Sequence, residues 1–130
     1  MWNVVHLTQS IASPPGEVVA FAGDPANLPQ WASGLSGGIR QRGGEWVTDS
    51  PMGEVIVRFA SANGFGVLDH DVVMPDGTTF HNPLRVLPNG DGSEVVFTLF
   101  QLDGVPDAEF EADAVTIRAD LERLRAVLEG

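Results

Sequence analysis

Hydrophobic and polar residues alternate along the start of the chain and again through most of its middle. Residues 4–11 place Val5, Leu7 and Ile11 on one face, which predicts a half-buried β-strand. Six more runs of this kind follow, separated by short turns rich in glycine or proline. They span residues 38–42, 45–50, 54–60, 67–74, 79–87 and 94–102. Connections this short join antiparallel neighbours, because a parallel pair needs a long crossover.

Two other stretches follow the period of a helix. Near the end of the chain, hydrophobic residues recur at alternating spacings of four and three, namely Phe110, Ala114, Ile117, Leu121, Leu124 and Leu128. This pattern predicts one long amphipathic helix. Between residues 13 and 35, proline and glycine signals and the spacing of Leu28 and Trp31 predict two short helices. The predicted fold class is therefore α+β, with a curved antiparallel sheet of seven strands, two short helices after the first strand, and a long C-terminal helix in its concave face.

The composition narrows the possible chemistry. The chain has 130 residues, as expected for a single domain spanning 1–130, and it contains neither cysteine nor lysine. Thiolate metal sites, cysteine nucleophiles and lysine Schiff bases are therefore excluded. Its net charge of −11 disfavours nucleic acids and anionic membranes as partners. Since no signal peptide or membrane-spanning run is evident, we expect a cytoplasmic protein that does not insert into membranes.

The turn at residues 63–64 predicts how two of the strands pair. Its sequence, Asn-Gly, is a strong signal for a two-residue hairpin. Such a hairpin would place Val57 opposite His70 and Arg58 opposite Asp69. A one-residue slip would turn every side chain to the other face, so we expect this register to be well defined.

A second turn, Pro-Asp-Gly at residues 75–77, predicts a three-residue connection. It places His70 opposite Asn82 and Asp71 opposite His81. Because successive side chains of a strand point to opposite faces, His70 and Asn82 point inward while the two aspartates that flank His70 point outward. We therefore expect no metal site and no carboxylate beside His70.

His70 and Asn82 are thus neighbouring polar groups on an otherwise apolar inner face. They either satisfy each other within a packed core or contact the polar end of a bound molecule. Trp31, at the end of the second short helix, either fills or gates one end of the same space. The predicted lining residues are His70, Asn82, Trp31, Val57, Phe59, Leu68, Val72, Leu84, Ile117 and Leu121. No phosphate-binding or dinucleotide motif occurs, and we expect no cofactor.

Four segments carry a resemblance to a known superfamily. They are SIASPPGEVV (10–19), DPANLPQW (24–31), FGVLDHDV (65–72) and GSEVVFTLF (92–100), followed by a helix that contains DLERL (120–124). With this order of elements, the chain resembles the SRPBCC superfamily of START, Bet v 1 and polyketide cyclase domains, and in particular its small bacterial members. The resemblance implies the helix-grip fold and a cavity for lipids, sterols, polyketides or other apolar compounds. It implies no single reaction, because members include carriers, receptors, cyclases and chaperone regulators.

Three functions are compatible with these observations. The favoured one is binding or transport of a small hydrophobic molecule between the sheet and the C-terminal helix. One alternative is an enzyme similar to polyketide cyclases or dehydrases, in which His70 moves protons and Asn82 holds an enolate oxygen. Another is a protein-interaction domain resembling regulators of chaperone ATPases. Binding is favoured because no acidic residue falls on the inner face to orient His70. The sequence leaves open the ligand and the choice between monomer and homodimer.

Overall fold

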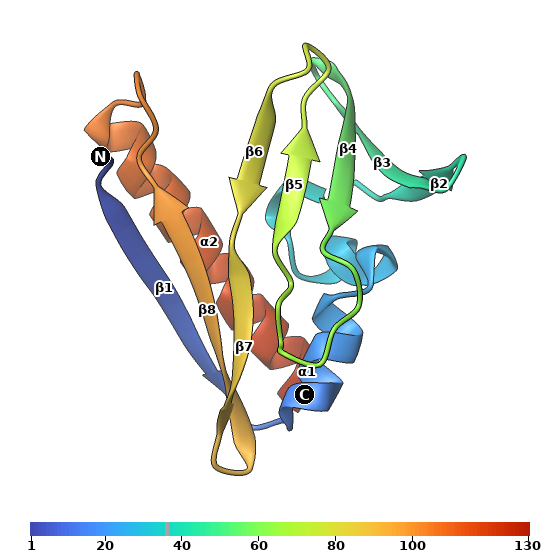
Figure 1. Ribbon diagram of the computed structural model, residues 1–130, viewed down its shortest axis with the longest axis vertical. Helices are drawn as coiled ribbons and strands as arrows, with labels where there is room; N and C mark the ends of the chain where they lie inside the picture. Colours follow the sequence, from blue (N-terminus) through green and yellow to red (C-terminus); the bar gives the residue numbers. More distant parts are fainter. Residues whose placement is uncertain (36) are drawn as a thin grey trace.

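The strands form antiparallel sheets on one side of a long C-terminal helix, which is the predicted helix-grip fold (Figure 1). The computed structural model describes residues 1–35 and 37–130. The first sheet has the order β1 (Val4–Ile11), β8 (Gly92–Phe100) and β7 (Leu84–Asn89). In this sheet the first strand of the chain, β1, pairs directly with the last, β8.

The second sheet has the strand order β2, β3, β4, β5 and β6, and every neighbouring pair is antiparallel. Its strands are Arg40–Arg42, Glu45–Ser50, Gly53–Phe59, His70–Val73 and Thr79–Asn82. Each follows its neighbour in the chain, as the short predicted turns require. This sheet provides the wall that faces the first half of the long helix.

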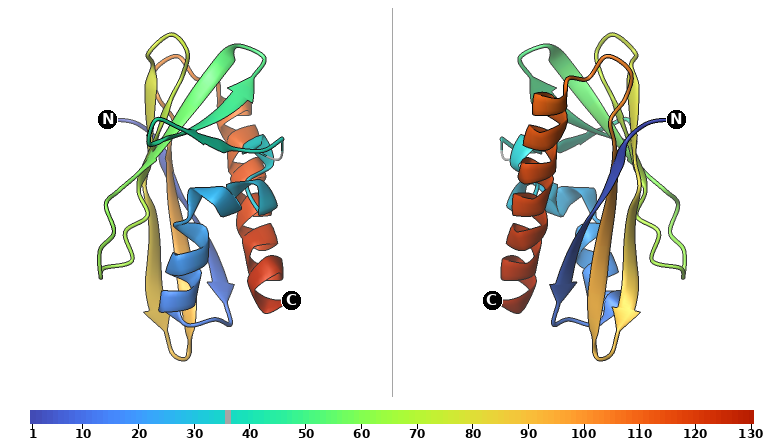
Figure 2. Two further views of the ribbon diagram at one scale, coloured as in Figure 1. Left: turned by 90° about the vertical axis from the view of Figure 1, so that its right-hand side faces the viewer. Right: turned by 90° about the vertical axis from the view of Figure 1, so that its left-hand side faces the viewer.

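The helices account for the remaining predicted elements. The long helix α2 spans Asp107–Glu129. The short helix α1 spans Pro15–Ala22 and lies at the end of the molecule where α2 ends (Figure 2). The second predicted short helix consists instead of two 3₁₀ segments, η1 (Pro25–Gln30) and η2 (Ser33–Leu35). Pro29 lies inside η1 and has no N–H to donate, which is one reason a regular α-helix does not form there. None of the helices described is long and apolar enough to cross a membrane.

One predicted strand is divided in two. Residues 79–87 were expected to form a single strand, but β6 ends at Asn82 and β7 begins at Leu84. Pro83 lies between them and cannot donate to a ladder, so the pairing partner changes at this point. Up to Asn82 the chain pairs with β5, and from Leu84 it pairs with β8. The described residues therefore form eight strands in two sheets, where the sequence predicted seven strands in one.

The register between β4 and β5 also differs from the prediction. Phe59, not Val57, lies opposite His70. The Asn-Gly at 63–64 does not form a two-residue hairpin, because Asn63 uses its side chain to organise a longer loop. Its carboxamide accepts hydrogen bonds from the backbone N–H groups of Phe65 and Val67. The shift is two residues, so the predicted faces of the strands are kept.

The loop lies against β7 and connects the two sheets. The N–H of Leu68 donates to the carbonyl of Leu84, and the N–H of Val86 donates to the carbonyl of Gly66. Gly66 has a φ of +71°, and a side chain there would collide with the carbonyl of Val86. Glycine therefore permits this close approach, which draws residues 66–68 away from β4.

The hydrophobic core lies where β1, β7, β8, α1 and the second half of α2 meet. Leu124 and Val18 have no measurable exposure, and Val95 is 1% exposed. The predicted helical stripe faces this core, but only Leu121 and Leu124 of its members are fully buried. The members before Leu121 are half-buried, because there α2 faces open space.

Candidate functional site

A cavity of about 880 Å³ lies between the sheets and the first half of α2. This volume is within the range of about 300–1,000 Å³ that is typical of small-molecule sites. The wall receives side chains from η1, from β3 to β6, from β8 and from α2. Its main apolar members are Leu28, Trp31, Val55, Val57, Val72, Phe97, Leu99, Phe110, Ile117 and Leu121.

Most of the predicted lining residues face this cavity. Seven of the ten line it, namely His70, Asn82, Trp31, Val57, Val72, Ile117 and Leu121. The remaining three, Phe59, Leu68 and Leu84, do not. Leu68 and Leu84 are buried in the core instead, at 7% and 0% exposure. The pairing of residues 66–68 with β7 places Leu68 there, and the change of partner at Pro83 does the same for Leu84. Phe59 packs behind the ring of His70.

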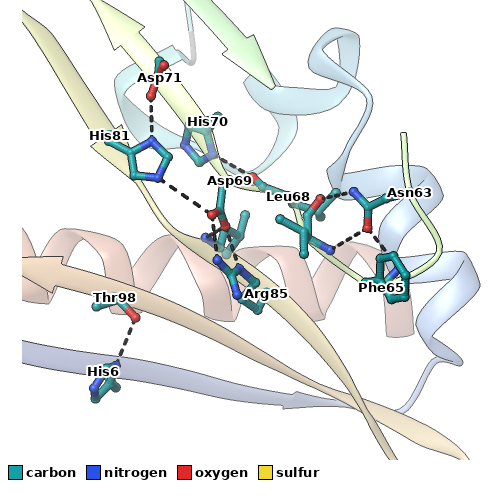
Figure 3. A network of polar contacts seen from close by, with 12 residues as sticks. His6, Asn63, Phe65, Leu68, Asp69, His70, Asp71, His81, Arg85 and Thr98 are labelled. Carbon is teal, nitrogen blue, oxygen red and sulfur yellow. Dashed lines mark hydrogen bonds and ion pairs between the residues drawn. The ribbon is translucent and has the colours of Figure 1, made fainter. Parts of the chain in front are cut away.

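His70 is held firmly at the cavity wall. Its Nδ1 lies 3.0 Å from the carbonyl oxygen of Leu68 (Figure 3). Its ring stacks on Phe59 with centroids 4.8 Å apart. Phe97 meets the same ring edge-on at 6.5 Å. Because a carbonyl oxygen only accepts, Nδ1 carries the hydrogen and Nε2 is left with a lone pair.

The imidazole of His70 is neutral at physiological pH. Burial lowers its pKa below 6.5, and the bond to Leu68 opposes this shift only partly. Nε2 has no hydrogen-bond partner among the described residues, yet it is not one of the atoms sealed from the surface. His70 therefore offers the cavity an accessible hydrogen-bond acceptor.

Asn82 lies directly opposite His70 in the pairing of β5 with β6, as the turn at 75–77 predicted. It is half-buried and lines the cavity. Its carboxamide makes no hydrogen bond to another described residue and is also not sealed from the surface. The structure thus brings the two predicted polar residues together without bonding them to each other.

The carboxylates near His70 lie on the outer face of the sheet, as predicted (Figure 3). Asp71 bonds Nδ1 of His81 at 2.7 Å. Asp69 accepts from Nε and Nη2 of Arg85, both at 2.8 Å. These bonds are the main cause that lowers the pKa of Asp69. The predicted pair between Arg58 and Asp69 is wrong, because the register places Arg58 opposite Asp71, and the guanidinium of Arg58 forms an ion pair with Glu45. No group of three or more side chains that could hold a metal occurs among residues 1–35 and 37–130.

The sheet wall is open between β6 and β8. Residues 79–82 of β6 and 97–100 of β8 all line the cavity, although alternate side chains of a strand point to opposite faces. Both faces contribute because the strands separate above Pro83, whose carbonyl accepts the N–H of Thr98 (Figure 1). The exposed aromatic residues Trp2, Phe80 and Phe100 also line this part of the cavity.

Sequence reasoning missed this second wall. It assigned no lining residue to the strand at 94–102, because the two turns used to predict strand pairing do not flank this strand. The period of two that links Val95, Phe97 and Leu99 could have identified Phe97 and Leu99. It could not have identified Phe80 or Phe100, because these line the cavity only where the strands separate.

The ionisable residues that line the cavity are acidic, apart from His70 and His81. No arginine lines it among the residues described, and the chain has no lysine. Asp49 is paired with Arg40, and Asp120 with Arg123. Glu109 and Asp113 are exposed on α2. The described wall therefore carries carboxylates but no arginine or lysine that would bind an anionic ligand.

Trp31 lies at the border between the cavity and the core. It is 5% exposed, and its indole N–H is the one buried side-chain N or O atom without a hydrogen-bond partner in the described part of the chain. Its backbone carbonyl accepts from Nη1 of Arg123 at 2.9 Å, which fixes the end of η1 to α2. Trp31 thus belongs both to the lining of the cavity and to the hydrophobic core.

Several solved structures share this fold at low sequence identity. DynU16, a protein from the dynemicin biosynthetic locus, has a TM-score of 0.71 and 17% identity over 97% of this chain. This chain covers 47% of DynU16, so it spans about half the length of that protein. MLL2253 from Mesorhizobium loti has a TM-score of 0.73 and 11% identity, with 98% of this chain and 97% of that one covered.

Ara h 8.0201 is similar over the whole of both chains, with a TM-score of 0.64 and 12% identity. At these identities the structures establish the fold alone. No curated protein matches the sequence. A family model described as polyketide cyclase / dehydrase and lipid transport matches residues 4–129. The match covers nearly the whole chain, and the chain therefore belongs to this polyketide cyclase / dehydrase and lipid transport family.

Proposed function

We propose that the protein binds and carries a small, predominantly apolar molecule in the cavity between the sheets and the first half of α2. The observation that carries this proposal is the cavity itself, with a volume of about 880 Å³ and a largely apolar wall. A few polar groups within an apolar enclosure are what small-molecule sites typically provide. The family to which the chain belongs includes lipid transport in its description, which agrees with this role.

Apolar burial can supply the affinity. A ligand that buries about 200 Å² of apolar surface gains on the order of 5 kcal/mol at roughly 25 cal/mol per Å². Part of this is lost to the restricted motion of the bound molecule. The polar anchors His70 and Asn82 then serve mainly to orient the ligand and to select it.

A cyclase- or dehydrase-like reaction is the second candidate. The observation that favours it is the unprotonated Nε2 of His70, which could accept a proton from a bound substrate. However, Nδ1 is held by a neutral backbone carbonyl, and both flanking aspartates bond residues on the outer face. No carboxylate among the described residues is hydrogen-bonded to His70 to stabilise its imidazolium, so we favour binding over catalysis.

Binding of a neutral fluorescent probe tests the proposal. We expect N-phenyl-1-naphthylamine to bind the purified protein saturably, with one probe per chain. Ile117→Trp should abolish this binding, because Ile117 lines the cavity and the larger ring fills it. Val115→Trp is the matched control, since Val115 lies on the same helix but is 65% exposed.

Native mass spectrometry of the untreated protein provides a second measurement, because a retained ligand adds a discrete mass. Probe binding that is not saturable, or that is equal in both tryptophan variants, would show that the cavity is not the site. Comparable unfolding transitions of the two variants establish that the comparison is between folded proteins.

A further inference from the structure

We propose that the bound molecule presents a hydroxyl group to His70 and Asn82, so that the cavity selects neutral, hydroxyl-bearing aromatic compounds. This inference rests on the proposed binding function and specifies the chemistry of its ligand. It follows from the hydrogen-bonding capacity that each of the two side chains leaves unused.

His70 requires a donor from the ligand. Its Nδ1–H is already bonded to the carbonyl of Leu68, and Phe59 and Phe97 hold the ring in place. The ring therefore cannot turn over to offer a different nitrogen without losing the hydrogen bond to Leu68. What remains accessible is the lone pair of Nε2, which can pair only with an O–H or N–H group.

Asn82 supplies the complementary donor. It lies directly opposite His70 on the neighbouring strand, where side chains of a cross-strand pair start about 5 Å apart. Its carboxamide is not used by other described residues and can donate through Nδ2. A hydroxyl group can donate to Nε2 of His70 and at the same time accept from Nδ2 of Asn82. A carbonyl or an ether satisfies Asn82 but leaves Nε2 facing a second acceptor.

The charge and shape of the wall narrow the class further. Glu109 and Asp113 border the cavity and no arginine lines it among the described residues, so carboxylate ligands are repelled. Aromatic side chains contribute to the wall, with Phe59 and Phe97 against the ring of His70 and Phe110 lining the cavity from α2. Such surroundings suit a flat aromatic body, because rings pack favourably edge to face or in offset stacks.

Four naphthalene derivatives separate these requirements, since they share one body and differ in a single group. The probes are 2-naphthol, 2-methoxynaphthalene, naphthalene and 2-naphthoate, each measured by displacement of N-phenyl-1-naphthylamine at pH 7.5. We expect 2-naphthol to bind about tenfold or more tightly than 2-methoxynaphthalene, which is the effect of one unsatisfied buried acceptor. We expect 2-naphthoate to bind most weakly.

Two variants assign the preference to the polar pair. His70→Leu should bring 2-naphthol and 2-methoxynaphthalene to equal affinity while naphthalene still binds. Asn82→Ala should reduce the preference in the same direction, and it provides an independent test if His70→Leu does not fold. His6→Leu is the matched control, because His6 is exposed on β1 and does not line the cavity.

The outcomes separate this inference from the proposed function. If none of the four compounds binds, the binding function itself is wrong. If the three neutral compounds bind with equal affinity, the cavity binds apolar molecules but the hydroxyl inference is overturned. A preference for 2-naphthol that persists in His70→Leu and Asn82→Ala would also overturn it, because the polar pair would not be its source.

Discussion

The two halves of α2 carry the same spacing of hydrophobic residues, yet they lie in different surroundings. In the second half, Leu121 and Leu124 are 1% and 0% exposed and pack among residues of β1, β8 and α1, and of these two only Leu121 also borders the cavity. In the first half, Phe110 and Ile117 are only half-buried and line the cavity. We call the packed region the closed half and the region around the cavity the open half of the molecule.

The difference arises in the sheet and not in the helix. In the closed half, β7 and β8 remain paired, α2 packs against β1 and β8, and α1 packs against β7. Above Pro83, β6 follows β5 away from β8, so the wall moves away from the first half of α2 (Figure 1). A regular helix stripe therefore faces a packed core at one end and open space at the other. We infer that the closed half provides most of the stability and that the open half provides the site.

The largest expected effect is the loss of a core side chain in the closed half. We expect Leu124→Ala to lower the free energy of unfolding by about 2–5 kcal/mol, as for other fully buried leucines. Ile117→Ala, on the same face of α2 and two turns earlier, should cost only about 1 kcal/mol, because Ile117 is already half-exposed to the cavity. Equilibrium unfolding in urea measures both values.

The matched control for this pair is Val127→Ala, since Val127 is 39% exposed on the same helix. We expect it to change the free energy of unfolding by less than about 0.5 kcal/mol. Equal losses for Leu124→Ala and Ile117→Ala would show that the open half is packed as tightly as the closed half, and the comparison would fail.

The next effect concerns the junction of the two halves. The carboxylate of Asp69, at the start of β5, accepts from the N–H of Leu84 at 3.0 Å and from Arg85. We expect Asp69→Ala to cost about 1–3 kcal/mol, because it leaves that backbone N–H without its partner. Asp71→Ala, which removes an exposed pair with His81, should cost less than about 1 kcal/mol.

Urea unfolding of the two aspartate variants distinguishes a structural junction from a surface ion pair. If both variants lost the same small amount of stability, Asp69 would be an ordinary surface residue. The link between β5 and β7 would then depend on the backbone hydrogen bonds of residues 66–68 alone.

The sequence predicted the parts of the fold that local chemistry determines. The turn at 75–77 is the best example, since Gly77 has a φ of +89° and the N–H of Met74 bonds the carbonyl of Thr78. A local turn of this kind sets the register of its two strands, so the pairing of His70 with Asn82 was predictable. The repeat along α2 was equally local, and it predicted the face of the helix.

The parts that were not predicted depend on contacts between distant segments. At residues 63–64 the Asn-Gly pair was compatible with a tight hairpin, but pairing of residues 66–68 with β7 provides two backbone hydrogen bonds that the hairpin would lack. Leu68 was therefore expected in the cavity and lies in the core. Similarly, Pro83 indicates an interruption of the strand at 79–87, but the sequence does not show which strands pair on each side of it. In the structure β6 pairs with β5 and β7 pairs with β8.

A smaller effect is expected in the pH dependence of stability. Burial lowers the pKa of His70, while Asp69 and Asp71 on its own strand raise it and His81 on β6 lowers it further. The unfolded chain therefore takes up the proton first as the pH falls below about 6.5. The stability that neutral His70 contributes is present above that pH and is lost as the pH falls towards its folded-state pKa.

Urea unfolding between about pH 7.5 and pH 5 measures this dependence. We expect the free energy of unfolding to decrease less steeply in His70→Gln than in the unmodified protein. His6→Gln, at an exposed histidine on β1, is the matched substitution against which this change of slope is compared. An unchanged slope in His70→Gln would indicate that the imidazole is solvated, and the wall of the open half would then be wetter than its lining residues imply.

The smallest expected effect lies at the border between the two halves. Trp31 is buried, but its indole N–H has no partner among the described residues. Trp31→Phe removes that unsatisfied donor, which favours the variant by about 1–3 kcal/mol, and it also removes ring contacts with the core, which disfavours it by a similar amount. We expect a net change below about 1 kcal/mol, whereas Trp31→Ala should cost about 3–5 kcal/mol because it removes the whole ring system from the core. A loss of more than about 3 kcal/mol in Trp31→Phe, measured by urea unfolding, would mean that the N–H is bonded after all. The end of the cavity would then be a fixed polar wall and not an apolar one.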